Sequence, residues 1–183
     1  MMMIDSEMID QLAAEIGFEY RAPAVPETFR VYPEVRAMCS ADKCQSYGRS
    51  WSCPPACGDI EHLSGRMRRY ESAILVQTVI TLSDPFDMEA IRAGEQRHKR
   101  RFDALVRQLR LKKAEIMPLG AGTCRRCRSC TYPDRPCRYP DKLWPSMEAC
   151  GLLVSEVCTR AGIDYYHGEG TMSFTSCVLY GKH

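Results

Sequence analysis

The chain of 183 residues lacks the features that would point to a membrane, to export or to nucleic acid. No apolar run approaches the roughly 20 residues that a membrane span needs, and residues 1–5 show no basic stretch followed by an apolar signal-peptide core. Neither sign of charge dominates, because 25 basic residues are balanced by 23 acidic ones for a net charge of +2. We therefore expect a cytoplasmic protein with no membrane or nucleic-acid partner.

Recognisable nucleotide-binding and hydrolase motifs are absent as well. The pairs of glycines at Gly120 and Gly122 and at Gly168 and Gly170 are too short for a P-loop or a dinucleotide fingerprint. No arrangement of serine, histidine and aspartate can be argued from the spacing. The sequence therefore assigns no catalytic residue, and whether the protein is an enzyme is left open.

Cysteine is the residue type that the chain has in excess, with eleven in total. Cytosolic thiols are kept reduced, so this density favours metal ligation or redox chemistry over disulfide bonds. The odd number agrees, because a disulfide framework would leave one thiol unpaired. The chemistry of this protein is therefore expected at its cysteines.

The strongest pattern is Cys124-x2-Cys127-x2-Cys130-x6-Cys137. Three cysteines at two-residue intervals let a tight loop direct its sulfurs at one object, and a fourth from further along completes the shell. Ferredoxin-type 4Fe-4S sites use such a run, whereas zinc is typically bound by two separated C-x2-C pairs. The spacing favours an iron–sulfur cluster and leaves zinc as the alternative.

A second set of cysteines runs Cys39-x4-Cys44-x8-Cys53-Pro-Pro-Ala-Cys57. Four thiols within nineteen residues again resemble a ligand shell, so we expect a second metal centre there, either a cluster or zinc. Trp51 is placed to shield such a centre from water. In two-cluster ferredoxins the late cysteine of a run binds the other cluster, so Cys57 and Cys137 could be exchanged between the sites.

The remaining three cysteines are expected in the hydrophobic core. Cys150 and Cys158 share the apolar face of a predicted helix, and Cys177 lies in an apolar strand. Buried free cysteines behave as small hydrophobic side chains.

Apolar periodicity and capping signals predict a single α/β domain spanning residues 1–183, with cysteine-rich loops at 39–57 and 124–137. Helices are predicted over 6–17, 58–70, from Asp84-Pro85 to about 112, and 145–162, with an extended segment over 22–33 and strands over 73–82, 114–119 and 173–180. Because strands alternate with helices, we expect a small, mostly parallel sheet flanked by helices. The unbroken apolar run over 73–82 is typical of an inner strand covered on both faces.

Several of these motifs together resemble the DUF2284 family of predicted metal-binding proteins. The matching residues are Cys39, Cys44, Tyr47-Gly48, Trp51-x-Cys53-Pro54-Pro55, the run from Gly120 to Cys130, Cys137-Arg138-x-Pro140 and the segment from Ser146 to Gly151. The resemblance extends from about Arg36 to Tyr180 and implies a cysteine-ligated metal or iron–sulfur site in a microbial protein. It implies no particular reaction.

Three functions follow from these patterns. The first is an iron–sulfur protein that exchanges electrons with a redox partner protein, in which eight cysteines fill two ligand shells. The second is an enzyme in which one centre has only three cysteines and an open iron acts as a Lewis acid on a small substrate. The third is an interaction module whose two loops are folded by zinc.

The charged residues near the cysteines have three interpretations. The second cysteine loop is surrounded by arginines that would offset the charge of a cluster, form a solvated loop or provide a docking surface for an acidic redox partner: Arg125, Arg126, Arg128, Arg135 and Arg138. The basic run over 97–101 lies on a predicted helix and is interpreted as a solvated face. Glu95 and His98 on the same helix are expected to form a satisfied pair at the rim of the core.

Overall fold

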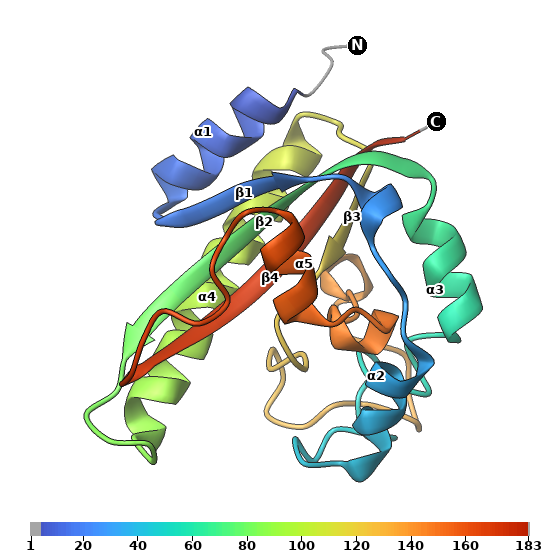
Figure 1. Cartoon of the computed structure of the whole chain (residues 1–183). Helices are drawn as coiled ribbons and strands as arrows, with labels where there is room; N and C mark the ends of the chain where they lie inside the picture. The colour runs from blue at the N-terminus through green and yellow to red at the C-terminus, as the bar shows by residue number, and fades with distance from the viewer. Residues whose placement is uncertain (1–4, 183) are drawn as a thin grey trace.

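Four strands form one sheet in the computed structural model, which describes residues 5–182 (Figure 1). From one edge to the other, the strands are β1 (Tyr20–Ala24), β2 (Tyr70–Thr81), β4 (Thr171–Lys182) and β3 (Ile116–Leu119). Every pair of neighbours is antiparallel. The prediction of a mostly parallel sheet is therefore wrong.

The error has a clear physical reason. Strands β2 and β3 are both antiparallel to β4, so they run in the same direction, and the long helix α4 (Met88–Leu111) connects them as the alternation predicts. Strand β4 nevertheless lies between them, which makes a split β-α-β arrangement. Alternation along the chain determines the direction of a strand but not its neighbour.

One face of the sheet is covered by α4 and by α1 (Ser6–Ile16) (Figure 1). Each helix begins at an aspartate whose carboxylate accepts a backbone N–H, Asp5 from Met8 at 2.8 Å and Asp87 from Ala90 at 2.9 Å. The buried side chains of this layer are Ile9, Ala13, Phe18, Ile74, Val76, Phe102, Leu105, Val106, Leu109, Val178 and Tyr180.

The other face carries shorter elements and a second apolar cluster. These elements are α2 (Pro33–Ala37), α3 (Ile60–Met67), α5 (Val154–Arg160) and the short 3-10 helix η4 (Glu148–Cys150). Cys150, Cys158 and Cys177 belong to this cluster and are fully buried, as predicted from the sequence. Burial raises the pKa of Cys150 to about 12 and that of Cys158 to about 11, so both stay protonated thiols.

The helix predicted over 145–162 is broken into η4 and α5. Gly151 adopts φ +78° between them, and a Cβ there would lie 2.8 Å from Ile60 Cδ1, so only glycine fits without strain. The carbonyl of Gly151 accepts the N–H of Tyr32 at 2.8 Å, and Val31 pairs with Leu152 in an isolated bridge. Contacts with a distant segment therefore override the local helical pattern.

Both cysteine loops lie at the same end of the sheet, below β3 in Figure 1. The first connects the 3-10 helix η2 (Met38–Ala41) to α3, and the second follows β3 and leads through η3 (Pro140–Lys142) to η4. The remaining short element is η1 (Pro26–Thr28), which follows β1. Among residues 5–182, no helix combines the length and the apolar character that crossing a membrane requires.

Candidate metal centre

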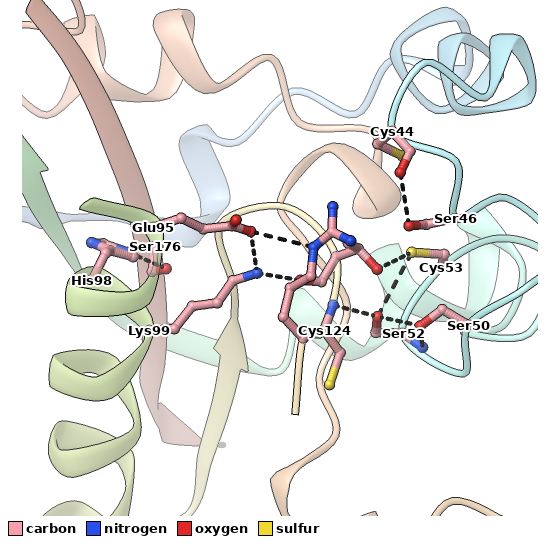
Figure 2. A network of polar contacts seen from close by, with 12 residues as sticks. Cys44, Ser46, Ser50, Ser52, Cys53, Glu95, His98, Lys99, Cys124 and Ser176 are labelled. Carbon is pink, nitrogen blue, oxygen red and sulfur yellow. Dashed lines mark hydrogen bonds and ion pairs between the residues drawn. The ribbon is translucent and has the colours of Figure 1, made fainter. Parts of the chain in front are cut away.

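Hydroxyl groups join the two cysteine loops directly. The backbone N–H of Cys124 donates to Ser52 Oγ at 3.0 Å, and the thiol of Cys53 donates to Thr123 Oγ1 at 3.1 Å (Figure 2). Ser50 Oγ supports this contact at 3.0 Å from Ser52 Oγ. Ser52, Cys53 and Thr123 are all buried, so the loops form one structural unit.

The four cysteines of the second loop line a single pocket of about 200 Å³. Cys124, Cys127, Cys130 and Cys137 are all partly buried. Trp51 from the first loop lines the same pocket, where its indole Nε1 donates to the Arg135 carbonyl at 3.1 Å and its ring meets Tyr132 edge-on at 4.9 Å. The structure thus brings together all four residues predicted from the C-x2-C-x2-C run.

The lining of this pocket is cationic. Its charged residues are Arg49, Arg125, Arg126, Arg128, Arg138 and Lys142. Among the described residues, no aspartate or glutamate lines it. A shell of thiolates carries negative charge, and these side chains offset that charge in a partly desolvated space.

Individual thiols of the second loop differ in how readily they ionise. Burial raises the pKa of Cys124, although Arg126 and Lys99 act in the opposite direction. At Cys130 burial opposes ionisation too, but hydrogen bonds from the backbone of Tyr132 and Trp51 hold its pKa below the ordinary value. Cys130 is therefore the thiol of this pair that is better prepared to be a ligand.

The cysteines of the first loop lie in two different environments. Burial raises the pKa of Cys39, and the charges of Glu148, Cys44 and Cys53 raise it further. Cys57 instead lies against Arg36, whose Nη1 is 3.8 Å from its sulfur.

Arg36 is held firmly in that position. Its guanidinium also donates to the carbonyl oxygens of Ala149 and Gly58, which ties α2 to η4 and to the end of the loop. Cys57 is further surrounded by apolar residues, because it packs against the core cluster that contains Cys150. The sequence prediction that Cys57 is a ligand stays a prediction.

Glu148 adds an oxygen donor to the first loop. Its Oε2 is buried and has no hydrogen-bond partner among the described residues. An unpaired buried carboxylate oxygen is costly unless it meets a cation or a donor. Glu148 also acts electrostatically on Cys39, and zinc and iron both accept carboxylate ligands.

The two sets of sulfurs do not merge into one site. Figure 2 shows the sulfur of Cys124 pointing away from that of Cys53, although hydrogen bonds join the two loops. Within residues 5–182, no three side chains of histidine, cysteine, aspartate or glutamate converge closely enough to hold a single ion.

Sequence analysis missed the hydroxyl residues between the loops, Ser50, Ser52 and Thr123. A signal was present, because Ser52 directly precedes Cys53 and Thr123 directly precedes Cys124. A small hydroxyl side chain beside a candidate ligand is positioned to hydrogen-bond sulfur. The carboxylate of Glu148 was also missed, since it lies about a hundred residues from the cysteines that it approaches.

Glu95 and His98 do not form the predicted pair. Glu95 Oε1 binds Lys99 Nζ at 2.6 Å and lies 3.8 Å from Arg125 Nε. His98 is fully buried, with Nδ1 3.0 Å from Thr78 Oγ1 and Nε2 2.8 Å from Ser176 Oγ. Each side chain is satisfied, but by a different set of partners.

One comparison with known proteins identifies a family for this chain. The model of the family DUF2284, described as a predicted metal-binding protein, matches residues 25–180. No curated protein and no solved structure matches the chain. The match covers both cysteine loops, Glu148 and the whole sheet except β1 and the end of β4. The chain therefore belongs to the DUF2284 family of predicted metal-binding proteins.

Proposed function

We propose that this metal-binding protein is an iron–sulfur protein that exchanges electrons with a protein partner. Cys124, Cys127, Cys130 and Cys137 would hold a 4Fe-4S cluster, which supplies a one-electron redox centre. The observation that carries the proposal is the pocket that these four thiols line together, enclosed by six basic side chains.

Size and cysteine spacing both favour a cluster over zinc in this pocket. Zinc binds sulfur at about 2.3 Å, so four ligands of one zinc ion lie almost in contact with one another. The pocket of about 200 Å³ leaves room for a larger group. The arginines would also stabilise zinc in a shell of four thiolates, so charge does not distinguish zinc from a cluster. The size of the pocket and the spacing of the cysteines both favour the cluster.

A second centre is proposed at the first loop, with Cys39, Cys44 and Cys53 as ligands. The spacing of these cysteines in the sequence and the electrostatic effect of Cys44 and Cys53 on Cys39 support it. Cys57 or the unpaired carboxylate of Glu148 would fill the fourth position.

An acidic redox protein is the partner that the charge of this end of the molecule fits. Arg125, Arg128 and Arg138 are exposed around the cysteine pocket, and complementary charge steers association of electron-transfer partners.

One observation favours a second candidate function at the first loop. The hydrogen bond from Arg36 holds the sulfur of Cys57 at 3.8 Å and competes with ligation. If Cys57 stays in that contact, an iron held by Cys39, Cys44 and Cys53 has an open position. An open iron acts as a Lewis acid, which would make the protein an enzyme.

Anaerobic purification of the full chain tests the main proposal. We expect a brown protein that bleaches with dithionite and contains iron and acid-labile sulfide in equal amounts. Cys127→Ser should lose this signal from the second loop, whereas Cys158→Ala, a change in the core, should keep it. A colourless protein with stoichiometric zinc would reject the redox function and support the zinc-stabilised interaction module.

A further inference from the structure

A second cavity lies beside the cysteine pocket, on the other side of the segment 120–126. It has a volume of about 200 Å³ and opens between that segment and α4. It is lined by Lys99 and Arg100 of α4, by Gly122 and Arg126 of the segment 120–126, and by Trp144 and Ser176. Cys124 lines both cavities, so they share a wall.

Two of the cations in this cavity are fixed in place by other side chains. Arg126 forms a two-pronged ion pair with Asp103, and its guanidinium lies over the Trp144 ring at 5.0 Å. Lys99 donates to Glu95 and to the Thr123 carbonyl. These contacts hold the charges rigid, which lowers the entropy cost of binding an anion.

The other cations have no such partners. Within residues 5–182, the side chains of Arg100 and Lys142 form no hydrogen bond or ion pair, and Arg125 reaches Glu95 only at 3.8 Å. Asp103 is the one acidic residue in the lining and is already bound to Arg126. The cavity therefore contains uncompensated positive charge.

Uncharged hydrogen-bond donors in this cavity also favour an anion as its ligand. The backbone N–H groups of Ala121 and Gly122 donate no hydrogen bond within residues 5–182, and Gly122 has φ +60° in this turn. Unpaired N–H groups of a glycine turn next to cationic side chains are a common environment for bound anions. Trp144 and Phe102 supply an apolar wall on one side.

We propose that this cavity binds a small oxyanion, either a carboxylate or a phosphate group. Pockets for drug-sized ligands and cofactors measure about 300–1,000 Å³, so a cavity of this size selects a small molecule over a nucleotide. The proposal requires no particular metal at the cysteines. It goes beyond the redox function because it gives the protein a ligand that lies against Cys124.

Equilibrium dialysis of the full chain tests this site with two probes, radiolabelled inorganic phosphate and radiolabelled malonate, at constant ionic strength. We expect one equivalent of one or both probes to bind saturably, and the tighter probe identifies the source of the oxyanion. Arg100→Gln and Lys142→Gln should each weaken binding about tenfold, since each removes a charged donor.

Arg92→Gln is the matched control, because Arg92 is exposed on the same helix and does not line the cavity. It should bind like the parent chain. Binding that does not saturate, or that falls equally in Arg92→Gln and Arg100→Gln, would overturn the proposal. Metal content is measured on the same sample, so a failure of the iron–sulfur proposal and a failure of anion binding are seen separately.

Discussion

The thiol of Cys53 lies 3.1 Å from the hydroxyl of Thr123, although 70 residues separate them in the sequence. This contact joins the first cysteine loop to the residue that precedes Cys124 (Figure 2). One hydrogen bond and the adjoining peptide therefore couple the electrostatic potential at one loop to a change in charge at the other.

Thr123→Val tests whether this contact tunes the first centre. If the first loop holds the redox centre proposed above, Cys53 would be a thiolate there and the hydroxyl would become the donor, which would stabilise the more negative, reduced state. Removing it should lower the reduction potential of the first centre. Thr123→Ser keeps the hydroxyl and should keep the potential, both measured by redox titration followed by electron paramagnetic resonance. Equal potentials in Thr123→Val and the parent chain would contradict this role.

Replacing Cys57 tests the ligands of the first loop. Because Arg36 holds the sulfur of Cys57, we expect Cys57→Ala to retain the iron of the parent chain. Cys53→Ala should lose the iron of the first centre. Iron and sulfide analysis of both variants decides between an open site and four-cysteine ligation, and loss of iron in Cys57→Ala would restore Cys57 as a ligand.

The buried imidazole of His98 predicts a loss of stability in acid. Burial, with help from Lys99 and Arg101, lowers its pKa to about 3 from 6.5. Below pH 6.5 the unfolded chain takes up a proton that the folded chain refuses, so the free energy of unfolding falls as the pH falls from 6.5 towards 3. One such group contributes a slope of about 1.4 kcal/mol per pH unit.

Urea unfolding between pH 4 and 7 measures this slope. His98→Gln should have a shallower pH dependence than the parent chain by that amount, whereas His62→Gln, an exposed position on α3, should leave it unchanged. A slope that is the same in His98→Gln and the parent chain would show that His98 does not titrate as its burial predicts.

Two helix glycines should respond oppositely to alanine. At Gly94 on α4 a Cβ would lie 2.7 Å from Ile80 Cγ2 and 3.0 Å from Phe174 Cε2, so α4 would have to move away from the sheet. Overpacking of this kind costs about 1–3 kcal/mol. At Gly65 on α3 nothing lies within 4 Å, so alanine should stabilise by up to about 1 kcal/mol through helix propensity. Urea unfolding of Gly94→Ala and Gly65→Ala checks both, and a stabilising Gly94→Ala would refute the close packing.

Local patterns predicted the elements well where a few neighbouring residues decide the conformation. The helix predicted over 6–17 is present with Gly17 at its end in the left-handed region, and the apolar run over 73–82 is an inner strand with both faces buried. The helix predicted up to about residue 112 ends at Leu111, but it begins at Met88, where Asp87 and not Asp84 caps it. The core positions of Cys150, Cys158 and Cys177 followed from the apolar residues around them.

Local sequence patterns did not predict which distant segments pair with one another. Nothing in the sequence of β4 shows that it inserts between β2 and β3, because an inner strand is apolar on both faces whichever neighbours it has. The break at Gly151 likewise depends on Tyr32 and Ile60, more than 90 residues away.

The sequence by itself determined which thiols of the second loop lie together outside the core, through the spacing of Cys124, Cys127 and Cys130. Only the tertiary structure decided that their loop docks on Ser52 and Cys53, that Arg36 engages Cys57, and that cations gather on both sides of Cys124. The reason is physical. Spacing within a loop limits how sulfurs can be presented, whereas contacts between loops form only after the sheet has brought segments far apart in the chain to one end.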